Sequence, residues 1–383
     1  MPLVAFVAIM SISAIVSLPG LAISPILDDL ERIFPGTSDL EIEMLESLPS
    51  LLIIPFMLLA GKWSIKGNKI RLLVVGTTIF LLSGLGSLLS RSLTELIVLG
   101  AIMGIGAGII IPLSTGLIVD YFTGEYRVKQ LGISSAVNNL TLVLATSLTG
   151  YLAGIKWYYA FAVYLLPAVT LILIPALSHA VPTIEPAKDD NTPVSLKHSS
   201  IFRLMLFYFV ITYCSLVVTF NTSYLTTAGS MSSSKAGVVI SLFFLAIMLP
   251  GFVLNRVKRL LGKMTYFWSL VVMGAGLIIM SLHHPRLYTL IVGAIFTGLG
   301  YGVMQPLIYD RAASLSPQRL ATLALSLVMA VNYCAILVAP FIIDGVDAIF
   351  HTSQHSFAFL CNGVISLLLA LLSLRWHESL YTQ

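Results

Sequence analysis

The stretch Gly104-Ile-Gly106-Ala-Gly108-Ile-Ile-Ile-Pro112-Leu113 occurs twice in this chain, the second time with several substitutions. The second copy begins at Gly298, 194 residues later (298 minus 104), and reads Gly-Leu-Gly-Tyr-Gly-Val-Met-Gln-Pro-Leu. The same offset carries Ala136-Val-Asn138 onto Ala330-Val-Asn332. Two matches at one spacing indicate an internal duplication. Its period is about half the chain, which is far too long for a solenoid repeat.

The composition places the chain in a membrane. Of its 383 residues 57% are hydrophobic and only 10% are charged, and the mean hydropathy is +0.97. Soluble domains contain about 25% charged residues, so this chain could not cover a surface that faces water. The net charge of +4 is small and scattered, which argues against a nucleic-acid partner. The three cysteines have no paired spacing, and no metal or other cofactor is expected.

Apolar runs of about 20 residues are long enough to cross a bilayer as helices. Twelve such runs occur, six on each side of the polar segment 181–200: 3–26, 44–63, 70–90, 94–121, 129–153, 157–179, 201–226, 235–256, 264–282, 287–313, 318–344 and 355–376. The sequence therefore predicts an all-α polytopic membrane protein with twelve transmembrane helices. These would form two pseudo-symmetric six-helix bundles, 1–180 and 201–383, joined by a cytoplasmic linker, 181–200.

Basic residues predict the orientation. If both termini lie in the cytoplasm, 16 of the 21 Lys and Arg residues fall on the cytoplasmic side and 5 on the outer side. This asymmetry follows the positive-inside rule. The paired glycines and prolines of the repeat also predict close helix packing and kinks in matching positions of the two halves. Two such bundles would rock about a central site.

The chain resembles the major facilitator superfamily over essentially its whole length. The loop 61–71 (Gly-Lys-Trp-Ser-Ile-Lys-Gly-Asn-Lys-Ile-Arg) is similar to the family's signature loop of glycines and basic residues. The glycines of 104–108 with Pro112 resemble the fourth-helix pattern of the drug-exporting branches. Gly100 stands where those branches have an arginine, Ser64 where the family has an acidic residue, and their fifth-helix glycine-proline pair is missing. The resemblance implies alternating access and a gating role for Lys62, Lys66 and Arg71.

Polar side chains within the spans are the candidates for a substrate site. Asn138 and Asn332 are related by the duplication and would offer hydrogen bonds at membrane depth, or would only hold neighbouring helices together. Tyr301 and Gln305 are four residues apart and share a helix face, whereas the first half has Ala107 and Ile111 there. The site is therefore expected to be asymmetric. Two further candidates on the seventh span, where packing is the alternative, are Tyr213 and Asn221.

Ionisable groups are scarce within the spans. Glu46 is the one carboxylate that could lie inside a span, and burial would suit it to proton coupling; the alternative is an acidic residue in an aqueous vestibule. Four charged residues at the cytoplasmic ends of spans are expected to act as gating or interface ion pairs: Asp120, Arg127, Asp310 and Arg311.

The sequence thus favours a secondary transporter for a small neutral or amphiphilic solute, because a multiply charged solute would require a matching fixed charge. Export in exchange for protons by a monomeric antiporter in the plasma membrane is the first hypothesis. No phosphate-binding loop is present, so ATP is not expected to drive transport. One alternative is uptake of a small nutrient or monoanion, by symport or facilitated diffusion. Another is a non-transporting membrane receptor with the same fold, whereas no constellation of an enzyme is visible.

Overall fold

The computed structural model describes residues 3–19, 21–26, 30, 33–34, 39–179, 198–228, 233–282, 286–350 and 355–375. Every regular element in these ranges is an α-helix or a 3-10 helix, which confirms the all-α fold class. Residues 181–197 of the predicted linker lie outside the described ranges. The division of the chain into 1–180 and 201–383 stays a prediction.

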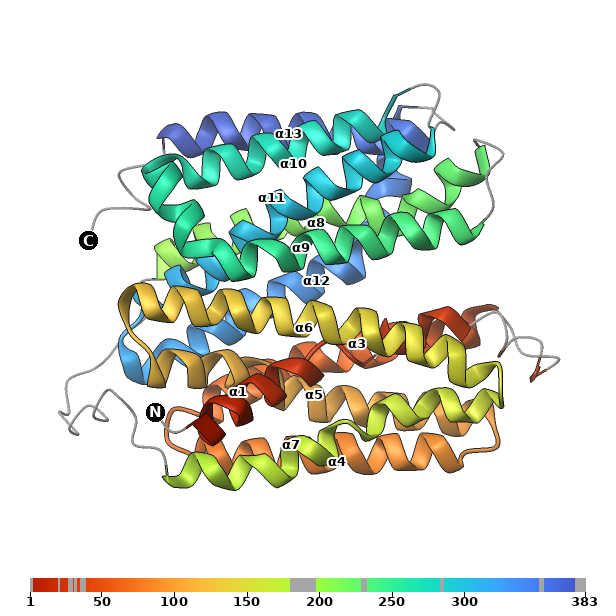
Figure 1. The fold of residues 1–383 in the computed structure, drawn as a ribbon, viewed down its shortest axis with the longest axis vertical. Helices are drawn as coiled ribbons and strands as arrows, with labels where there is room; N and C mark the ends of the chain where they lie inside the picture. Colours follow the sequence, from red (N-terminus) through yellow and green to blue (C-terminus); the bar gives the residue numbers. More distant parts are fainter. Residues whose placement is uncertain are drawn as a thin grey trace. The chain divides into compact units, whose positions relative to one another are not determined.

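Figure 1 shows the helices, coloured in the order of the chain. The first group comprises α1 (Leu3–Ile15), η1 (Leu21–Ile26), α3 (Asp39–Trp63), α4 (Lys69–Leu89), α5 (Leu93–Tyr121), α6 (Gly124–Ala153), η2 (Trp157–Leu165), α7 (Pro167–Leu173) and η3 (Ile174–His179). The second comprises α8 (His198–Ala228), α9 (Ser233–Leu261), η4 (Gly262–Met264), α10 (Thr265–Met280), α11 (Leu287–Ser314), η5 (Gln318–Leu320), α12 (Ala321–Ile349) and α13 (His355–Arg375).

Nine helical stretches among the described residues are long and apolar enough to cross a membrane. One of them, Lys235–Met280, comprises α9, η4 and α10 and so covers most of two predicted spans, 235–256 and 264–282. Gly262, whose φ is +52°, lies at the turn between α9 and α10. Two shorter apolar helices, Leu3–Ile15 and Ser47–Trp63, lie within the predicted spans 3–26 and 44–63.

Local sequence explains where α4 and α5 begin. Asn68 precedes α4, and its side-chain oxygen accepts hydrogen bonds from the backbone N–H groups of Ile70 (2.9 Å) and Arg71 (3.2 Å). Ser92 precedes α5 and accepts from the backbone N–H of Glu95 at 3.3 Å. Both side chains satisfy N–H groups that have no partner inside the helix, which is the usual role of an N-cap.

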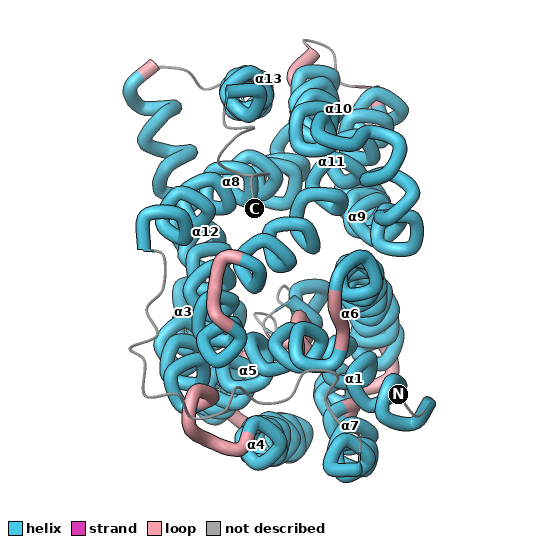
Figure 2. The backbone as a smooth tube through the Cα atoms, turned by 90° about the vertical axis from the view of Figure 1, so that its left-hand side faces the viewer, coloured by secondary structure: helices cyan, strands magenta, loops and turns pink. Residues whose placement is uncertain are grey.

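The described chain falls into two compact units. Unit 1 consists of residues 1–127, 137–203 and 309–333, and unit 2 of 128–136, 204–308 and 334–383. In unit 1, α5 packs along both α3 and α4, as Figure 1 shows. In unit 2, α10 packs along α13, and the two lie side by side in Figure 2 as well. Each unit therefore includes a segment from the other half of the sequence.

The repeated glycines explain how α5 fits between its neighbours. An added Cβ at Gly104 or Gly108 would overlap the backbone carbonyl of Pro49 or Ile53, both in α3. At Gly106 the Cβ would lie 2.7 Å from the carbonyl oxygen of Gly76 in α4. Residues four apart share a helix face and the residue midway between them lies on the opposite side. The outer glycines therefore admit α3 and the middle one admits α4.

The second copy of the motif makes the same contacts in unit 2. Gly298 and Gly302 face the backbone of α9, at Phe243 and Ile247, while Gly300 between them faces Ser269 of α10. The same three positions thus receive two neighbouring helices in both copies. This agreement supports the internal duplication that the sequence predicts, and it confirms that the glycines serve close helix packing.

Replacing Gly302 with alanine should destabilise the protein, because the new methyl group would overlap the carbonyl carbon and Cα of Ile247, which lie 3.0 and 2.9 Å from the added atom. Overpacking of this kind costs about 1–3 kcal/mol. The measurement is the thermal melting temperature of the detergent-solubilised protein. Gly150→Ala is the control, because Gly150 lies in a helix with nothing within 4 Å of an added Cβ. Equal melting temperatures for the two variants would contradict the packing role.

Candidate functional site

A chain of five hydrogen-bonded side chains runs through unit 2. The Ser135 hydroxyl donates to Oε1 of Gln305 at 3.0 Å, and Nε2 of Gln305 donates to the Tyr208 hydroxyl at 3.3 Å. The Tyr208 and Tyr301 hydroxyls lie 3.5 Å apart, and the Tyr301 hydroxyl lies 3.3 Å from Oγ1 of Thr212. We call these five residues the polar chain.

Three helices supply the polar chain. Tyr301 and Gln305 share a face of α11, Tyr208 and Thr212 share a face of α8, and Ser135 comes from α6. The side chains from α8 and Tyr301 are buried, whereas Gln305 and Ser135 are half-buried. Tyr301 and Gln305, which are predicted to share a helix face, thus belong to one hydrogen-bond network, and substrate binding by them stays a prediction. None of the five groups is ionised at neutral pH.

A backbone contact brings α6 close to the helices of the second half. Gly132 of α6 and Gly251 of α9 face each other, and a Cβ on either would overlap the carbonyl oxygen of the other. Ser135 lies one turn further along α6, close to the face that carries Gly132. The glycine contact therefore positions the Ser135 hydroxyl to reach Gln305.

An apolar cluster in unit 1 joins helices from both halves of the sequence. Its buried members come from α3, α5 and α12. Partly buried residues of α3, α11, α12 and the segment just after α1 pack against it: Ile53, Met57, Ala107, Ile111, Met329 and Ala330, with Val16, Ile54, Leu58, Tyr309 and Tyr333 around them. The segment 309–333 therefore packs against the helices of the first half. In the orientation that the basic residues predict, this segment lies toward the cytoplasm.

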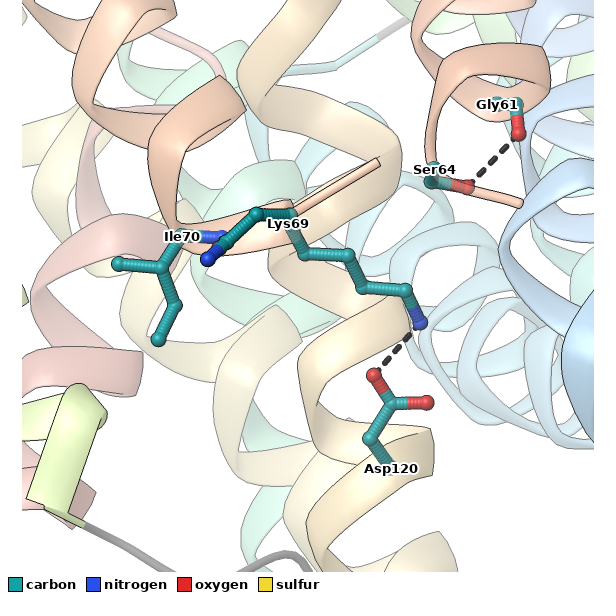
Figure 3. A network of polar contacts seen from close by, with 6 residues as sticks. Gly61, Ser64, Lys69, Ile70 and Asp120 are labelled. Carbon is teal, nitrogen blue, oxygen red and sulfur yellow. Dashed lines mark hydrogen bonds and ion pairs between the residues drawn. The ribbon is translucent and has the colours of Figure 1, made fainter. Parts of the chain in front are cut away.

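Two ion pairs lie at the same end of the helices. Nζ of Lys69 lies 2.6 Å from Oδ2 of Asp120, within the first half, as Figure 3 shows. Nε of Arg127 lies 2.7 Å from Oδ1 of Asp310, and its Nη2 donates to Ser314 at 2.6 Å. The four charged side chains are 16–20% exposed, which is low enough for these pairs to contribute more than a fully solvated pair would.

Ser64 lies in the loop 61–71, at the position where the resemblance implies an acidic residue. Ser64 is buried, and its hydroxyl donates to the carbonyl oxygen of Gly61 at 2.7 Å, so it closes the end of α3 locally (Figure 3). Gly61 itself faces Ser326 of α12, where an added Cβ would overlap the serine side chain. The absence of a side chain at Gly61 therefore lets the end of α3 approach α12 closely.

Asn138 forms hydrogen bonds with Ser17, which lies where the first predicted span is interrupted. The predicted span 3–26 is not one helix: α1 ends at Ile15 and η1 begins at Leu21. Pro19 has no backbone N–H, which favours the break. The Ser17 N–H, one of the groups released there, donates to Oδ1 of Asn138 at 3.2 Å, and Nδ2 of Asn138 donates to the Ser17 hydroxyl at 2.7 Å. Asn138 therefore connects α6 to the segment between α1 and η1, and a role for it in substrate binding stays a prediction.

The other three residues predicted to bind substrate lie outside the polar chain. Asn332 is half-buried in α12, and the helix that corresponds to the interrupted first span, α8, continues without a break. Tyr213 and Asn221 are buried in α8. Tyr213 adjoins Thr212 in sequence, whereas Asn221 lies nine residues (221 minus 212) beyond the end of the polar chain. Binding of substrate by these residues stays a prediction.

The charged residues that the sequence singled out differ in exposure, and the side chain of one of them is not described. Glu46 lies in α3, but its side chain is outside the described part of the chain. Lys62, Lys66 and Arg71 are exposed, and Arg311 is half-buried beside Asp310 in sequence. The residue that pairs with Asp120 is Lys69, which sequence reasoning did not single out.

Sequence reasoning also missed Ser135, Tyr208 and Thr212. A signal was present on the seventh span, where Tyr208, Thr212 and Ser215 follow one another at helical spacing and form a polar stripe in an apolar segment. For Ser135 no signal was available, because its partner lies 170 residues away.

Asn138→Leu should destabilise the protein by about 1–3 kcal/mol, because the partly buried Ser17 N–H loses its acceptor. Asn138→Asp should be milder, since a carboxylate can accept from both the N–H and the hydroxyl of Ser17. Melting temperatures of the two variants test this. Ser17→Ala should add little in the Asn138→Leu background, and full additivity of the two changes would contradict a direct interaction.

Comparison with known proteins identifies the family. The model of the Major Facilitator Superfamily matches residues 3–231 and 204–380. The uncharacterized MFS-type transporter YceJ of Bacillus subtilis (strain 168) is 24% identical over 355 residues, which cover 90% of this chain and 89% of that protein. The multidrug transporter protein MdtP of the same organism is 32% identical over 120 residues, which are 31% of this chain and only 21% of that relative.

Among solved structures, the proton:xylose symporter XylE bound to 6-bromo-6-deoxy-D-glucose has a TM-score of 0.76 at 13% identity, covering 98% of this chain and 95% of the other. At that identity the likeness concerns the fold. The matches of the family model extend across nearly the whole chain and agree with the apolar helices and the duplicated glycine motif. The chain belongs to the Major Facilitator Superfamily.

Proposed function

We propose that this transporter exports a small neutral or amphiphilic solute across the plasma membrane by alternating access, in exchange for protons. Both termini would lie in the cytoplasm, and a monomer would suffice. The observation that carries this proposal is the polar chain. It offers hydrogen bonds without a fixed charge and lies among apolar helices.

The depth of the polar chain supports a role in binding. Gln305 lies nine residues (314 minus 305) before the end of α11 at Ser314, or about 14 Å along the helix axis. That is about half of a hydrocarbon core 30 Å thick. Transporters of this family bind substrates near the midplane between their two halves.

The contacts at the predicted cytoplasmic end support a gate. Arg127 and Asp310 come from different halves of the sequence, and so do the members of the apolar cluster around 309–333. In the proposed mechanism these contacts would form when the transporter is closed toward the cytoplasm. Opening toward the cytoplasm would have to break them.

Flux of a lipophilic fluorescent dye in proteoliposomes tests export directly. An imposed pH gradient should drive dye into vesicles in which the protein's cytoplasmic face points outward, and collapse of the gradient should abolish the accumulation. Accumulation in the opposite direction would favour uptake instead. Absence of flux for dyes, sugars and monoanions would favour a receptor without transport activity.

Glu46→Gln is expected to remove proton coupling if Glu46 is the coupling carboxylate. The variant should still exchange dye down its concentration gradient, but the imposed pH gradient should no longer concentrate it. The measurement is dye flux at several pH values. A pH profile identical to that of the original protein would exclude Glu46 from the mechanism.

Loss of the Arg127–Asp310 pair should favour the cytoplasm-open state. A hydrogen bond to a charged group contributes about 1.5–3 kcal/mol, so Asp310→Asn should shift the equilibrium by roughly tenfold or more. A cysteine introduced at the cytoplasmic end would report this shift as faster alkylation from that side.

The charge reversal Arg127→Asp with Asp310→Arg serves as the control for this pair. The double variant should recover much of the slow alkylation that either single reversal loses. If it alkylates as fast as the single variants, the pair does not hold the gate.

A further inference from the structure

The structure points to Gln305 as an exchange site, at which the Ser135 hydroxyl and a hydrogen-bond donor on the substrate compete for one carbonyl oxygen. This inference rests on the proposed function and specifies the substrate class. We infer that the transported amphiphile carries an N–H or O–H donor, such as a primary or secondary amine or an alcohol.

The two ends of the Gln305 amide bind side chains on different helices. Its Nε2 group is directed to the Tyr208 hydroxyl on α8, while Oε1 accepts from Ser135 on α6. The α8 partner is buried and belongs to the same half of the sequence as Gln305. The α6 partner comes from the first half. One end of the amide is therefore fixed within its half, and the other end is bound to a helix that must move.

Opening toward the cytoplasm would change the hydrogen-bond partner of the Gln305 carbonyl oxygen. A cytoplasmic opening separates α6 from α9 and α11, so the backbone contact of Gly132 with Gly251 and the Ser135–Gln305 hydrogen bond break together. The Oε1 atom then loses the Ser135 donor at the depth where substrate arrives. A donor on the substrate can take the same position, which offsets the loss of that hydrogen bond.

The Gln305 carbonyl oxygen selects substrates that carry a hydrogen-bond donor. An amide carbonyl accepts hydrogen bonds and donates none, and the adjoining Tyr208 and Tyr301 hydroxyls are bonded to each other or to neighbours. No carboxylate belongs to the polar chain, so a positive charge on the substrate is not required. A donor-bearing amphiphile should bind more tightly than its fully alkylated counterpart by about 3- to 10-fold, the range expected for one net hydrogen bond.

Only one copy of the duplicated motif supplies a side-chain acceptor at these positions. The first-half counterparts of Tyr301 and Gln305 are Ala107 and Ile111, which are buried in the apolar cluster of unit 1. They supply no acceptor. Hydrogen bonding to substrate at this level therefore depends on α11.

The test uses the full-length purified protein and two rhodamine dyes, one with secondary-amine N–H groups and one in which both nitrogens are fully alkylated. Binding is measured by fluorescence polarisation. The original protein should prefer the N–H dye by about 3- to 10-fold. Gln305→Leu should abolish this preference, whereas Gln305→Glu, which keeps an acceptor oxygen, should retain it. A preference that survives in Gln305→Leu overturns the inference.

Ser135→Ala tests the competition itself and removes only one oxygen atom, so it carries the test even if the Gln305 variants do not fold. It should bind the N–H dye more tightly and leave the alkylated dye less affected. In the Gln305→Leu background it should change neither. Unchanged or weaker binding of the N–H dye by Ser135→Ala overturns the exchange.

Different outcomes would contradict the exchange site alone and export itself. Equal affinity for both dyes, together with dye flux, would refute the exchange site and leave export standing. Binding and transport of neither dye would contradict export of amphiphiles and the exchange site with it.

Discussion

Backbone-to-backbone contact at the repeated glycines is the constraint on which the rest of this structure depends. In a bilayer, apolar surfaces gain little by leaving lipid, so helices associate through close packing. The motif of α5 admits α3 on one side and α4 on the other, and the motif of α11 admits α9 and α10 in the same way. Each motif helix is thereby fixed in rotation as well as in position.

That fixed rotation decides which residues of α11 are available for other contacts. The glycines at 298, 300 and 302 use two sides of the helix, and the intervening Tyr301, with Gln305 one turn later, lies on a third side toward α8 and α6. The corresponding side of α5 carries Ala107 and Ile111 in an apolar cluster. One packing scheme thus supports an apolar contact surface in one copy and a hydrogen-bonding surface in the other.

The duplicated halves have diverged in the same sense elsewhere. Asn138 and Asn332 occupy equivalent sequence positions, yet Asn138 binds Ser17 at an interruption of the first span, whereas α8 is continuous. At the predicted cytoplasmic end, Arg127 pairs with Asp310 and therefore links helices from both halves. Symmetric packing therefore carries asymmetric polar contacts, from which we propose one binding surface and one gate within a duplicated framework.

The sequence by itself determined the all-helical membrane fold, the duplication and the glycine packing, because hydrophobic periodicity and spacing are local properties of the chain. It also brought Tyr301 and Gln305 together, since residues four apart share a helix face. It could not supply Ser135, Lys69 or the Ser17 partner of Asn138, because those contacts join segments 51 to 170 residues apart. Only the tertiary structure decided them: which polar groups meet depends on how the helices are rotated and spaced, and close contacts distant in sequence set both.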